Sequence, residues 1–598
     1  MCAQIKADAA APGCAFRYSA VVSRIRTLAP VAILALSNVL AERAGASPKA
    51  EPAMSAHASA EYYTLIAEIA LTRDEPRVAA LSYVSAAAAD ASLWRRATVV
   101  AAGSLQPTVA LDAAEHWIGR TPTSLAAHLA AADAARSLYQ IAVAADNYRF
   151  VIAHFSGGVE AAFPDIEQRL AAAENPYAAR QIADRLTGYF PTSAGARRLQ
   201  GFAALQAGDY PAAARAFRAA LARLPAARAH GEAAAVVLQR RRLTEALRRA
   251  RVLGGDVAAP LAEAAAALRK DPRAGNRYDY AILLLAANKP AAAYAQMRLL
   301  LHDPRFGPDA LHMVALLDFQ DGRVAAARAR FAQLLAGGHY ADESYYYLGL
   351  IADRQGDLIV ALRELARVRH GIDVLPAMMR VAMILRAKGA ASSADALLGE
   401  LTENEPQRAP QIIAVRAQVD ARVGETQRAL EVLGEAIREY PDDPALQYAR
   451  ASIEDEAGQT TAALAILRAV LAARPDDPEA MNAYGYTLAD HGLRLERAQD
   501  LITRALAVAP DDAAMRDSLA WVLYREGRLA QALPIVSAAY ADAPGGDIGA
   551  HYGEILWRLG RRAAAERVWQ SAAAIDPDDR LLRQTRQRLT AAAPALIH

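Results

Sequence analysis

The feature that most constrains the fold of this chain is a glycine followed five residues later by an alanine, which in its best-preserved stretch recurs every 33 to 35 residues. Glycine readily adopts the left-handed conformation that ends a helix, and a small side chain lets two helices cross closely. Such a recurrence predicts stacked helix-turn-helix units rather than one large core. The pairs are Gly208 with Ala213, Gly322 with Ala327, Gly356 with Ala361, Gly389 with Ala394, Gly424 with Ala429, Gly458 with Ala463, Gly527 with Ala532 and Gly560 with Ala565.

Two neighbouring segments, 513–546 and 546–577, follow the same plan over their whole length. Each has a first helix ended by glycine, a second helix with alanines at the crossing, and a proline that closes the unit. This plan resembles the tetratricopeptide repeat (TPR), a helix-turn-helix unit of about 34 residues. The predicted fold is all-α, a right-handed superhelical solenoid of about fifteen TPR-like repeats.

The repeat also predicts how the chain is organised. One unit carries an extra residue between Gly492 and Ala498, which should lengthen one turn without disturbing the stack. Further upstream the match is looser, with the alanine position taken by Ala293, Ala246, Ala179, Ala142, Ala110 and Ala79. The predicted segments are a signal peptide at 1–46, a linker at 47–59, a degenerate N-terminal solenoid at 60–258, an inserted helix and soft boundary at 259–273, a regular C-terminal solenoid at 274–578, and a capping helix and tail at 579–598.

Composition narrows the class of protein. The chain is 54% hydrophobic but only 6% aromatic, because much of its apolar content is alanine, a strong helix former and a poor strand former. This disfavours β sandwiches and barrels. The net charge of +2 comes from basic and acidic residues mixed along the chain, so no nucleic-acid partner is predicted.

The N-terminus resembles a secretory signal peptide. Arg24 and Arg26 precede an apolar run, residues 27–41, that leads to an A-x-A pattern ending at Ala46. The run is too short to span a membrane, so no transmembrane segment is predicted. An amphipathic first helix and a misassigned start codon are the alternative interpretations.

No motif for catalysis, cofactor binding or metal binding is recognisable. The P-loop, zinc-protease and nucleophile-elbow patterns do not occur, and the two cysteines, Cys2 and Cys14, cannot form a structural zinc site. The Pro-Asp-Asp triplets that begin at residues 441, 475, 510 and 577 could suggest calcium, but helix stops followed by N-caps explain them more simply. No catalytic residue, cofactor or metal is therefore predicted, and the protein is expected not to be an enzyme.

A solenoid offers a concave surface lined by the first helix of each repeat. The stripe of first-helix positions that turns away from the stack carries aromatic and charged residues, the types that most often anchor a protein partner. Packing between repeats is the alternative role for these rings. The predicted protein-binding residues are Tyr346, Arg354, Arg386, Tyr486, Asp517, Trp521, Tyr524, Arg525, Trp557 and Arg558.

The run AMNAYGYTLADHGLRLERAQDLITRALAVAPDDAAMRDSLAWVLYREGRLAQAL, residues 480–533, is more specific than a generic repeat. It resembles a family of proteobacterial exported TPR proteins, usually outer-membrane lipoproteins, and the resemblance is close over residues 410–578. A characterised member is an adaptor that binds and stimulates a periplasmic carboxy-terminal processing protease and helps deliver cell-wall hydrolases to it. This chain departs from the pattern because no cysteine follows the apolar run, which puts lipid anchoring in doubt.

The resemblance implies a noncatalytic scaffold that recruits or activates a periplasmic protease and its cell-wall hydrolase substrates. A scaffold for exopolysaccharide or envelope assembly and secretion is the alternative. The expected location is the periplasm, in association with the outer membrane if the resemblance holds that far, and the cytoplasm if the signal is not real.

Overall fold

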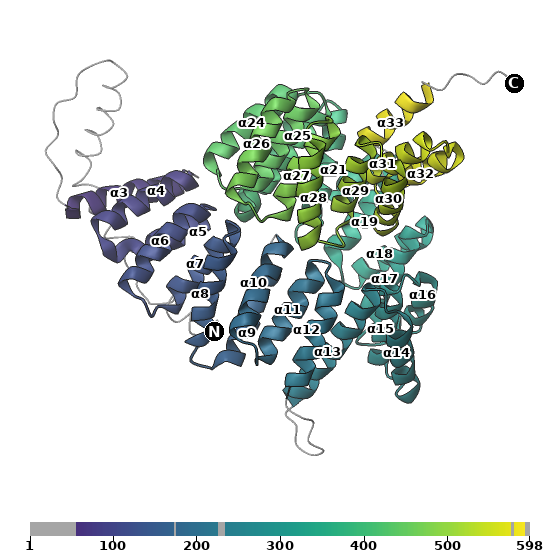
Figure 1. Ribbon diagram of the computed structural model, residues 1–598, viewed down its shortest axis with the longest axis horizontal. Helices are drawn as coiled ribbons and strands as arrows, with labels where there is room; N and C mark the ends of the chain where they lie inside the picture. Colours follow the sequence, from purple (N-terminus) through teal and green to yellow (C-terminus); the bar gives the residue numbers. More distant parts are fainter. Residues whose placement is uncertain (1–55, 74, 173–174, 225–233, 576–578, 592–598) are drawn as a thin grey trace. The chain divides into compact units, whose positions relative to one another are not determined.

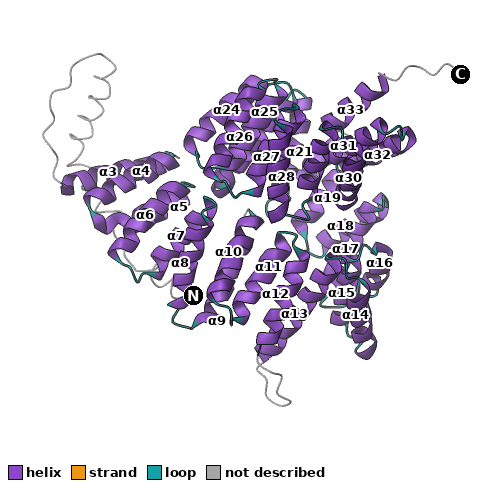
Figure 2. Cartoon of the chain, in the orientation of Figure 1, coloured by secondary structure: helices purple, strands orange, loops and turns teal. Residues whose placement is uncertain are grey.

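The computed structural model describes residues 56–591 except for 74, 173–174, 225–233 and 576–578, and every regular element in this part of the chain is a helix (Figures 1 and 2). The first twelve are α3 (Ala56–Thr72), α4 (Pro76–Ala89), α5 (Trp94–Gly103), α6 (Pro107–Arg120), α7 (Leu125–Ser137), α8 (Ile141–Ala153), α9 (Val159–Ala171), α10 (Pro176–Tyr189), α11 (Ala194–Gln206), α12 (Tyr210–Arg223), α13 (Ala234–Leu253) and α14 (Ala258–Lys270).

The remaining helices are more regular in length. They are α15 (Ala274–Ala286), α16 (Pro290–Arg298), α17 (Gly307–Gln320), α18 (Val324–Ala336), α19 (Ala341–Arg354), α20 (Leu358–Leu365), α21 (Val374–Ala387), α22 (Ala391–Asn404), α23 (Ala409–Arg422), α24 (Thr426–Glu439), α25 (Pro444–Glu456), α26 (Thr460–Ala473), α27 (Pro478–Asp490), α28 (Leu495–Val508), α29 (Ala513–Arg525), α30 (Leu529–Asp542), α31 (Gly546–Arg558), α32 (Arg562–Ile575) and α33 (Arg580–Ala591). Two short 3₁₀ segments, η1 (Ala91–Leu93) and η2 (Pro406–Arg408), precede α5 and α23.

Within the described residues, consecutive helices pack against each other in the pairs α3–α4, α5–α6 and α11–α12 and in every pair from α15–α16 to α31–α32, and the all-α repeat fold is confirmed. The turn inside each regular pair depends on a residue with positive φ. Gly527 adopts φ +80°, and Asn288 adopts φ +53° in the one turn where asparagine stands at the glycine position. The extra residue after Gly492 is accommodated by Arg494, which adopts φ +46° just before α28.

The predicted alanines lie at the helix crossings. Ala327, Ala361, Ala532 and Ala565 are completely buried, as are most of their equivalents. Ala142 is an exception, because it is exposed while Ala144 and Ala145 are buried two and three residues later. The predicted register of that repeat was therefore wrong.

Large side chains of the second helix fill the space beside small residues of the first. A Cβ atom at Gly201 would meet the Phe217 ring, and one at Gly349 would meet Leu365. In both pairs the large residue lies 16 positions after the glycine. Gly553 and Trp569 repeat this spacing, so the largest buried ring of the described chain occupies the place that a glycine leaves free.

The Pro-Asp-Asp triplets act as predicted. The carboxylates of Asp443, Asp477 and Asp512 accept hydrogen bonds from backbone N–H groups in the first turns of α25, α27 and α29. Asp579 accepts one from Leu582 at the start of α33. These groups are helix N-caps.

The described chain divides into two compact units, each considered by itself. Unit 1 comprises the described part of Met1–Ala134 together with Phe150–Ile166, and its core is built from alanines around Tyr83 and Trp94. Unit 2 comprises Ala135–Arg149 and Glu167–His598 and holds α10–α33.

The predicted boundaries fall as follows. The signal peptide and most of the linker lie outside the described residues, and α3 begins at Ala56, inside the segment predicted as linker. The helix predicted over 260–270 is α14, and the domain boundary predicted around it stays a prediction.

Candidate functional site

The first helices of neighbouring repeats contact one another directly in the C-terminal part of unit 2. The helix α27 packs on α29, α29 on α31, and α31 on the terminal helix α33. In a curved stack this closely spaced layer lies on the inner side. We call the surface of α27, α29, α31 and α33 the inner face.

Trp521 lies in the centre of the inner face. Its indole N–H donates to the Asp490 carboxylate at 2.9 Å, and its ring stacks on His551 and Tyr524 with centroid distances of 4.1 and 4.7 Å. Only 6% of the residue is exposed. The structure therefore places Trp521 in the packing between repeats, and its ring offers a partner little surface.

His551 and Asp517 form a buried pair beside this ring. The Nδ1 atom of His551 lies 2.7 Å from an Asp517 carboxylate oxygen, and both residues are buried. The hydroxyl of Tyr486 lies 3.5 Å from Nε2 of the same histidine, and burial raises the pKa of this tyrosine well above its ordinary value. Burial also opposes the charged form of His551, but the carboxylates of Asp517, Asp490 and Asp547 outweigh it and raise the histidine pKa.

This pair predicts a pH dependence of stability. A raised folded-state pKa means that the stabilisation is fully present below about pH 6.5, the ordinary histidine value, and is lost as the pH rises through the folded-state pKa. The pKa of Asp547 is raised to about 6 by desolvation and by Asp579, so this carboxyl adds a separate loss of stability as the pH rises to about 6. We expect the melting temperature of the native chain to fall between about pH 7 and pH 9 relative to that of His551→Phe, measured by circular dichroism. Parallel curves would show that the histidine is not charged in the fold.

An exposed cationic rim borders the buried cluster. The Tyr524 hydroxyl donates to Glu554 at 2.7 Å, and the same carboxylate pairs with Arg588 at 2.5 Å. Arg558 lies over this group, with its Nε 3.3 Å from the Tyr524 hydroxyl and 51% of its side chain exposed. Arg525 donates to the backbone carbonyl of Asp490 and remains partly exposed. These arginines and the half-buried Tyr524 are what the inner face presents to a partner.

The other predicted residues lie elsewhere. Trp557 is half-buried against Trp569, with ring centroids 5.6 Å apart, in the core of the last repeat. Tyr346 packs against the apolar cluster around α21. Arg354 is exposed, and its guanidinium lies 4.6 Å from the Phe319 ring.

Arg386 is not available to a partner. Its side chain is almost fully buried and pairs with Asp395 at 2.7 Å, Asp420 at 2.5 Å and Glu425 at 2.9 Å. The prediction counted it with the surface residues because an arginine at a first-helix position is usually solvated. Here the neighbouring repeats supply enough carboxylates to bury it.

The sequence analysis did not predict several residues of the inner face, above all His551, Glu554 and Arg588. A signal was present, because Asp517 and His551 are 34 residues apart, as are Glu554 and Arg588. That separation equals the repeat length, so equivalent positions of adjacent repeats face one another. Complementary charges at this spacing mark pairs that cross from one repeat to the next.

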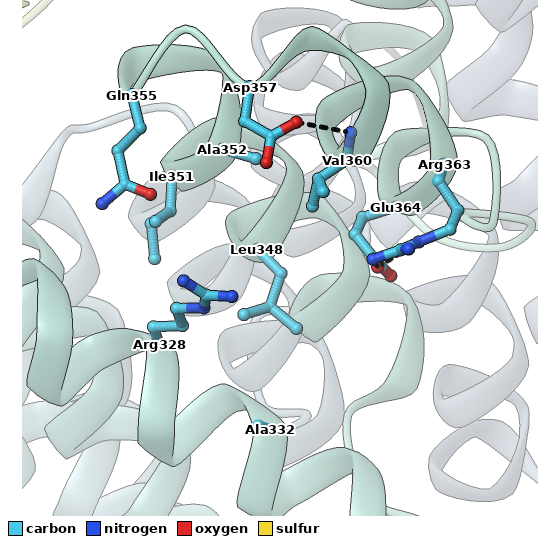
Figure 3. A pocket seen from close by; sticks show the side chains of 10 residues that line it. All are labelled: Arg328, Ala332, Leu348, Ile351, Ala352, Gln355, Asp357, Val360, Arg363 and Glu364. Carbon is cyan, nitrogen blue, oxygen red and sulfur yellow. Dashed lines mark hydrogen bonds and ion pairs between the residues drawn. The ribbon is translucent and has the colours of Figure 1, made fainter.

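A pocket of about 200 Å³ lies between α18, α19 and α20 (Figure 3). Figure 3 shows Arg328 beside Leu348 and Ile351, while Asp357 accepts a hydrogen bond from the Val360 backbone. None of the predicted site residues lines it. Among the described residues, no cluster of histidine, cysteine or carboxylate side chains suits a metal ion. In the same part of the chain, no helix has the length and apolar character needed to cross a membrane.

Comparison with known proteins agrees with the repeat architecture. Residues 198–255, 421–485 and 485–547 match tetratricopeptide repeat families. The TPR repeat-containing protein PA4667 of Pseudomonas aeruginosa is 30% identical over 213 residues, and the match covers 36% of this chain and 36% of that protein.

Solved structures with a similar course include yeast Tom70 and a thermophilic TPR protein of Thermus thermophilus. Tom70 is 12% identical with a TM-score of 0.34, covering 88% of this chain and 99% of that one. The Thermus protein is 22% identical with a TM-score of 0.27, covering 31% and 98%. The family matches fall in both halves of the chain, so residues 198–255, 421–485 and 485–547 are identified as tetratricopeptide repeats.

Proposed function

We propose that this chain is a noncatalytic scaffold that binds protein partners on the inner face of its C-terminal repeats. TPR proteins bind protein partners, and the observation that carries the proposal is the rim formed by exposed Arg558 and partly exposed Arg525 and Tyr524 over a buried cluster. Arginine and tyrosine on a preorganised surface are the residues that most often dominate binding energy. The buried support lowers the ordering cost that a partner must offset.

We further propose that the partner is a periplasmic carboxy-terminal processing protease with its cell-wall hydrolase substrates. The support is the resemblance of residues 410–578 to exported TPR adaptors, and the 30% identity over 213 residues to a TPR protein of Pseudomonas aeruginosa is compatible with it. The proposal requires export. Sequencing the N-terminus of the mature protein is the direct test, and a first residue of Ser47 is expected.

The binding surface is tested with one exposed arginine. We expect Arg558→Ala to reduce capture of the partner from a periplasmic extract by about tenfold, as for a hot-spot residue. The melting temperature should change little, because the side chain is half exposed and Glu554 keeps Arg588 as a partner. Capture is measured by quantitative mass spectrometry of proteins retained by the tagged full chain.

Arg328→Ala is the matched control, since Arg328 is an exposed arginine on α18, away from the inner face. It should capture as the native chain does. Equal capture by both variants would show that Arg558 and the rim around it do not belong to the binding surface. Retention of export or polysaccharide-assembly components in place of a protease would favour the envelope-assembly scaffold, and peptidase activity of the isolated chain would contradict the noncatalytic role.

A further inference from the structure

Two stretches of unit 2 that are far apart in sequence pack against each other. Tyr177 of α10 and Ala207, after α11, share one buried apolar cluster with Met481, Leu501 and Met515 of α27–α29. Both Tyr177 and Met481 are buried. The helices α27–α29 therefore pack against α10 and the end of α11, which precede them by about 300 residues in the sequence. We call this packing the closing contact.

Polar bonds reinforce the apolar cluster. The Tyr177 hydroxyl donates to the Asp512 carboxylate at 2.6 Å, and Arg180 donates to the Val508 backbone carbonyl at 2.6 Å. Arg180 also pairs with Asp209 at 2.5 Å. From the other side, Arg474 donates to the Ser137 carbonyl at 3.1 Å.

Negative charge is concentrated at the closing contact. Asp477 is almost fully buried, and Glu479 lies beside it at the start of α27. Burial, followed by the charges of Asp477 and Asp512, raises the pKa of Glu479 to about 7, and Arg474 offsets this in part.

Tyrosines from three other elements complete the surroundings of Glu479. They are Tyr139 between α7 and α8, Tyr177 of α10 and Tyr448 of α25, and in each case burial first and these carboxylates second raise the tyrosine pKa. Glu479 therefore shares its electrostatic surroundings with Asp477, Asp512, Arg474 and these three tyrosines.

We propose that the closing contact is a reversible latch, in which unit 2 is closed on itself through α10–α11 and α27–α29 and is released as Glu479 becomes charged. The direction follows from proton linkage. In the open form Glu479 is solvated and has its ordinary pKa near 4.5, whereas in the closed form the pKa is about 7. The closed form binds the proton more tightly, so it loses its advantage as the pH rises from about 4.5 to about 7 and loses no more above that.

The latch acts at the ends of the helices that carry the inner face. Closing it ties α27 and α29 to α10 and α11, and opening it frees the C-terminal repeats to move away from the earlier ones. A partner that engages these repeats from both sides therefore has to compete with the latch. This goes beyond the proposed function and holds whatever the partner is.

A disulfide trap measures the population of the closed form. A Cβ atom at Gly208 would lie 3.7 Å from the Cβ of Asp511, within the separation of about 3.5 to 4.5 Å that a disulfide needs. We expect Gly208→Cys with Asp511→Cys, in the full chain with Cys2 and Cys14 replaced by serine, to form the bond readily. The measurement is the effective concentration of the two thiols against glutathione at about pH 5.5 and about pH 8, and the value should be higher at the lower pH, where Glu479 is neutral in the closed form.

Gly356→Cys with Asp511→Cys is the matched control. Gly356 has φ +77°, close to the +78° of Gly208, and a Cβ there meets no atom within 4 Å. Both pairs therefore carry a similar backbone penalty, and only the first has its partner close by. Equal effective concentrations in the two pairs would overturn the closing contact itself.

Two further substitutions in the Gly208/Asp511 pair test reversibility in opposite directions. Tyr177→Phe removes the bond to Asp512, so the effective concentration should fall about tenfold. Glu479→Gln removes the charge at nearly the same shape, so the effective concentration at about pH 8 should rise by about two orders of magnitude. Helical circular dichroism confirms that both variants are folded. If neither substitution changes the effective concentration, the contact is static and the latch is overturned.

Discussion

Arg386→Ala is expected to destabilise unit 2 by about 3 to 5 kcal/mol, the cost of breaking a buried ion pair by removing one partner. The guanidinium of Arg386 touches three carboxylates, and Asp420 among them is completely buried. Alanine would leave Asp420 with Arg428, at 3.7 Å, and Arg416 to offset its charge. The loss of unfolding free energy should be largest in α21–α24, the helices that supply the ion-pair network.

Repeat arrays can unfold in segments, so a local measurement is needed beside the urea melt. Hydrogen exchange should show faster exchange in α21–α24 and little change in α29–α32. Arg354→Ala is the control, because Arg354 is an exposed arginine at the end of a first helix and its removal should cost no more than about 0.5 kcal/mol. Similar losses in both variants would mean that Arg386 is solvated and that its ion pairs do not form.

Replacing both partners separates charge burial from packing. Arg386→Met with Asp420→Leu removes the buried charges while keeping apolar volume, and such replacements are often neutral. The double variant should therefore recover much of the stability that Arg386→Ala loses. A double variant as unstable as the single one would point to lost packing as the cause.

The sequence predicts the repeat because glycine and alanine each have one physical role at a fixed place. A positive φ at Gly527 and complete burial of Ala532 are consequences of the helix-turn-helix unit alone, which is local. The register failed near Ala142, where several alanines follow one another and none is distinguished by size.

The inner face was harder to predict because its residues are shared between two uses. The helical periodicity of the sequence predicts on which side of α29 the Trp521 side chain lies. It does not predict whether the neighbouring helices α27 and α31 cover that side chain. Asp490 and His551 do cover it, and this could be inferred only by comparing one repeat with the next. The separation of 34 residues that joins Arg386 to Asp420 and Asp517 to His551 is the information that a single repeat lacks.

Trp569→Ala is the second substitution with a large expected effect, about 3 to 5 kcal/mol, because it removes a completely buried indole. The ring fills the space between α31 and α32 and contacts the core that α33 closes. A cavity of that size cannot be refilled by neighbours held in two helices. Urea unfolding followed by circular dichroism measures the loss, and hydrogen exchange should place it in α31–α33.

The same site can be tested from the other side, through Gly553. A methyl group there would overlap the indole of Trp569, so Gly553→Ala should cost about 1 to 3 kcal/mol by overpacking. Gly434→Ala is the matched control, since Gly434 also lies inside a helix but a Cβ there meets nothing within 4 Å; it should stabilise by up to about 1 kcal/mol. Trp569→Phe shortens the ring, so Gly553→Ala should cost less in that background, and the difference is the coupling between the two residues. A gain in stability from Gly553→Ala in the native background would show that the indole does not lie against this glycine, and the spacing of 16 residues would then not define the packing of the repeat.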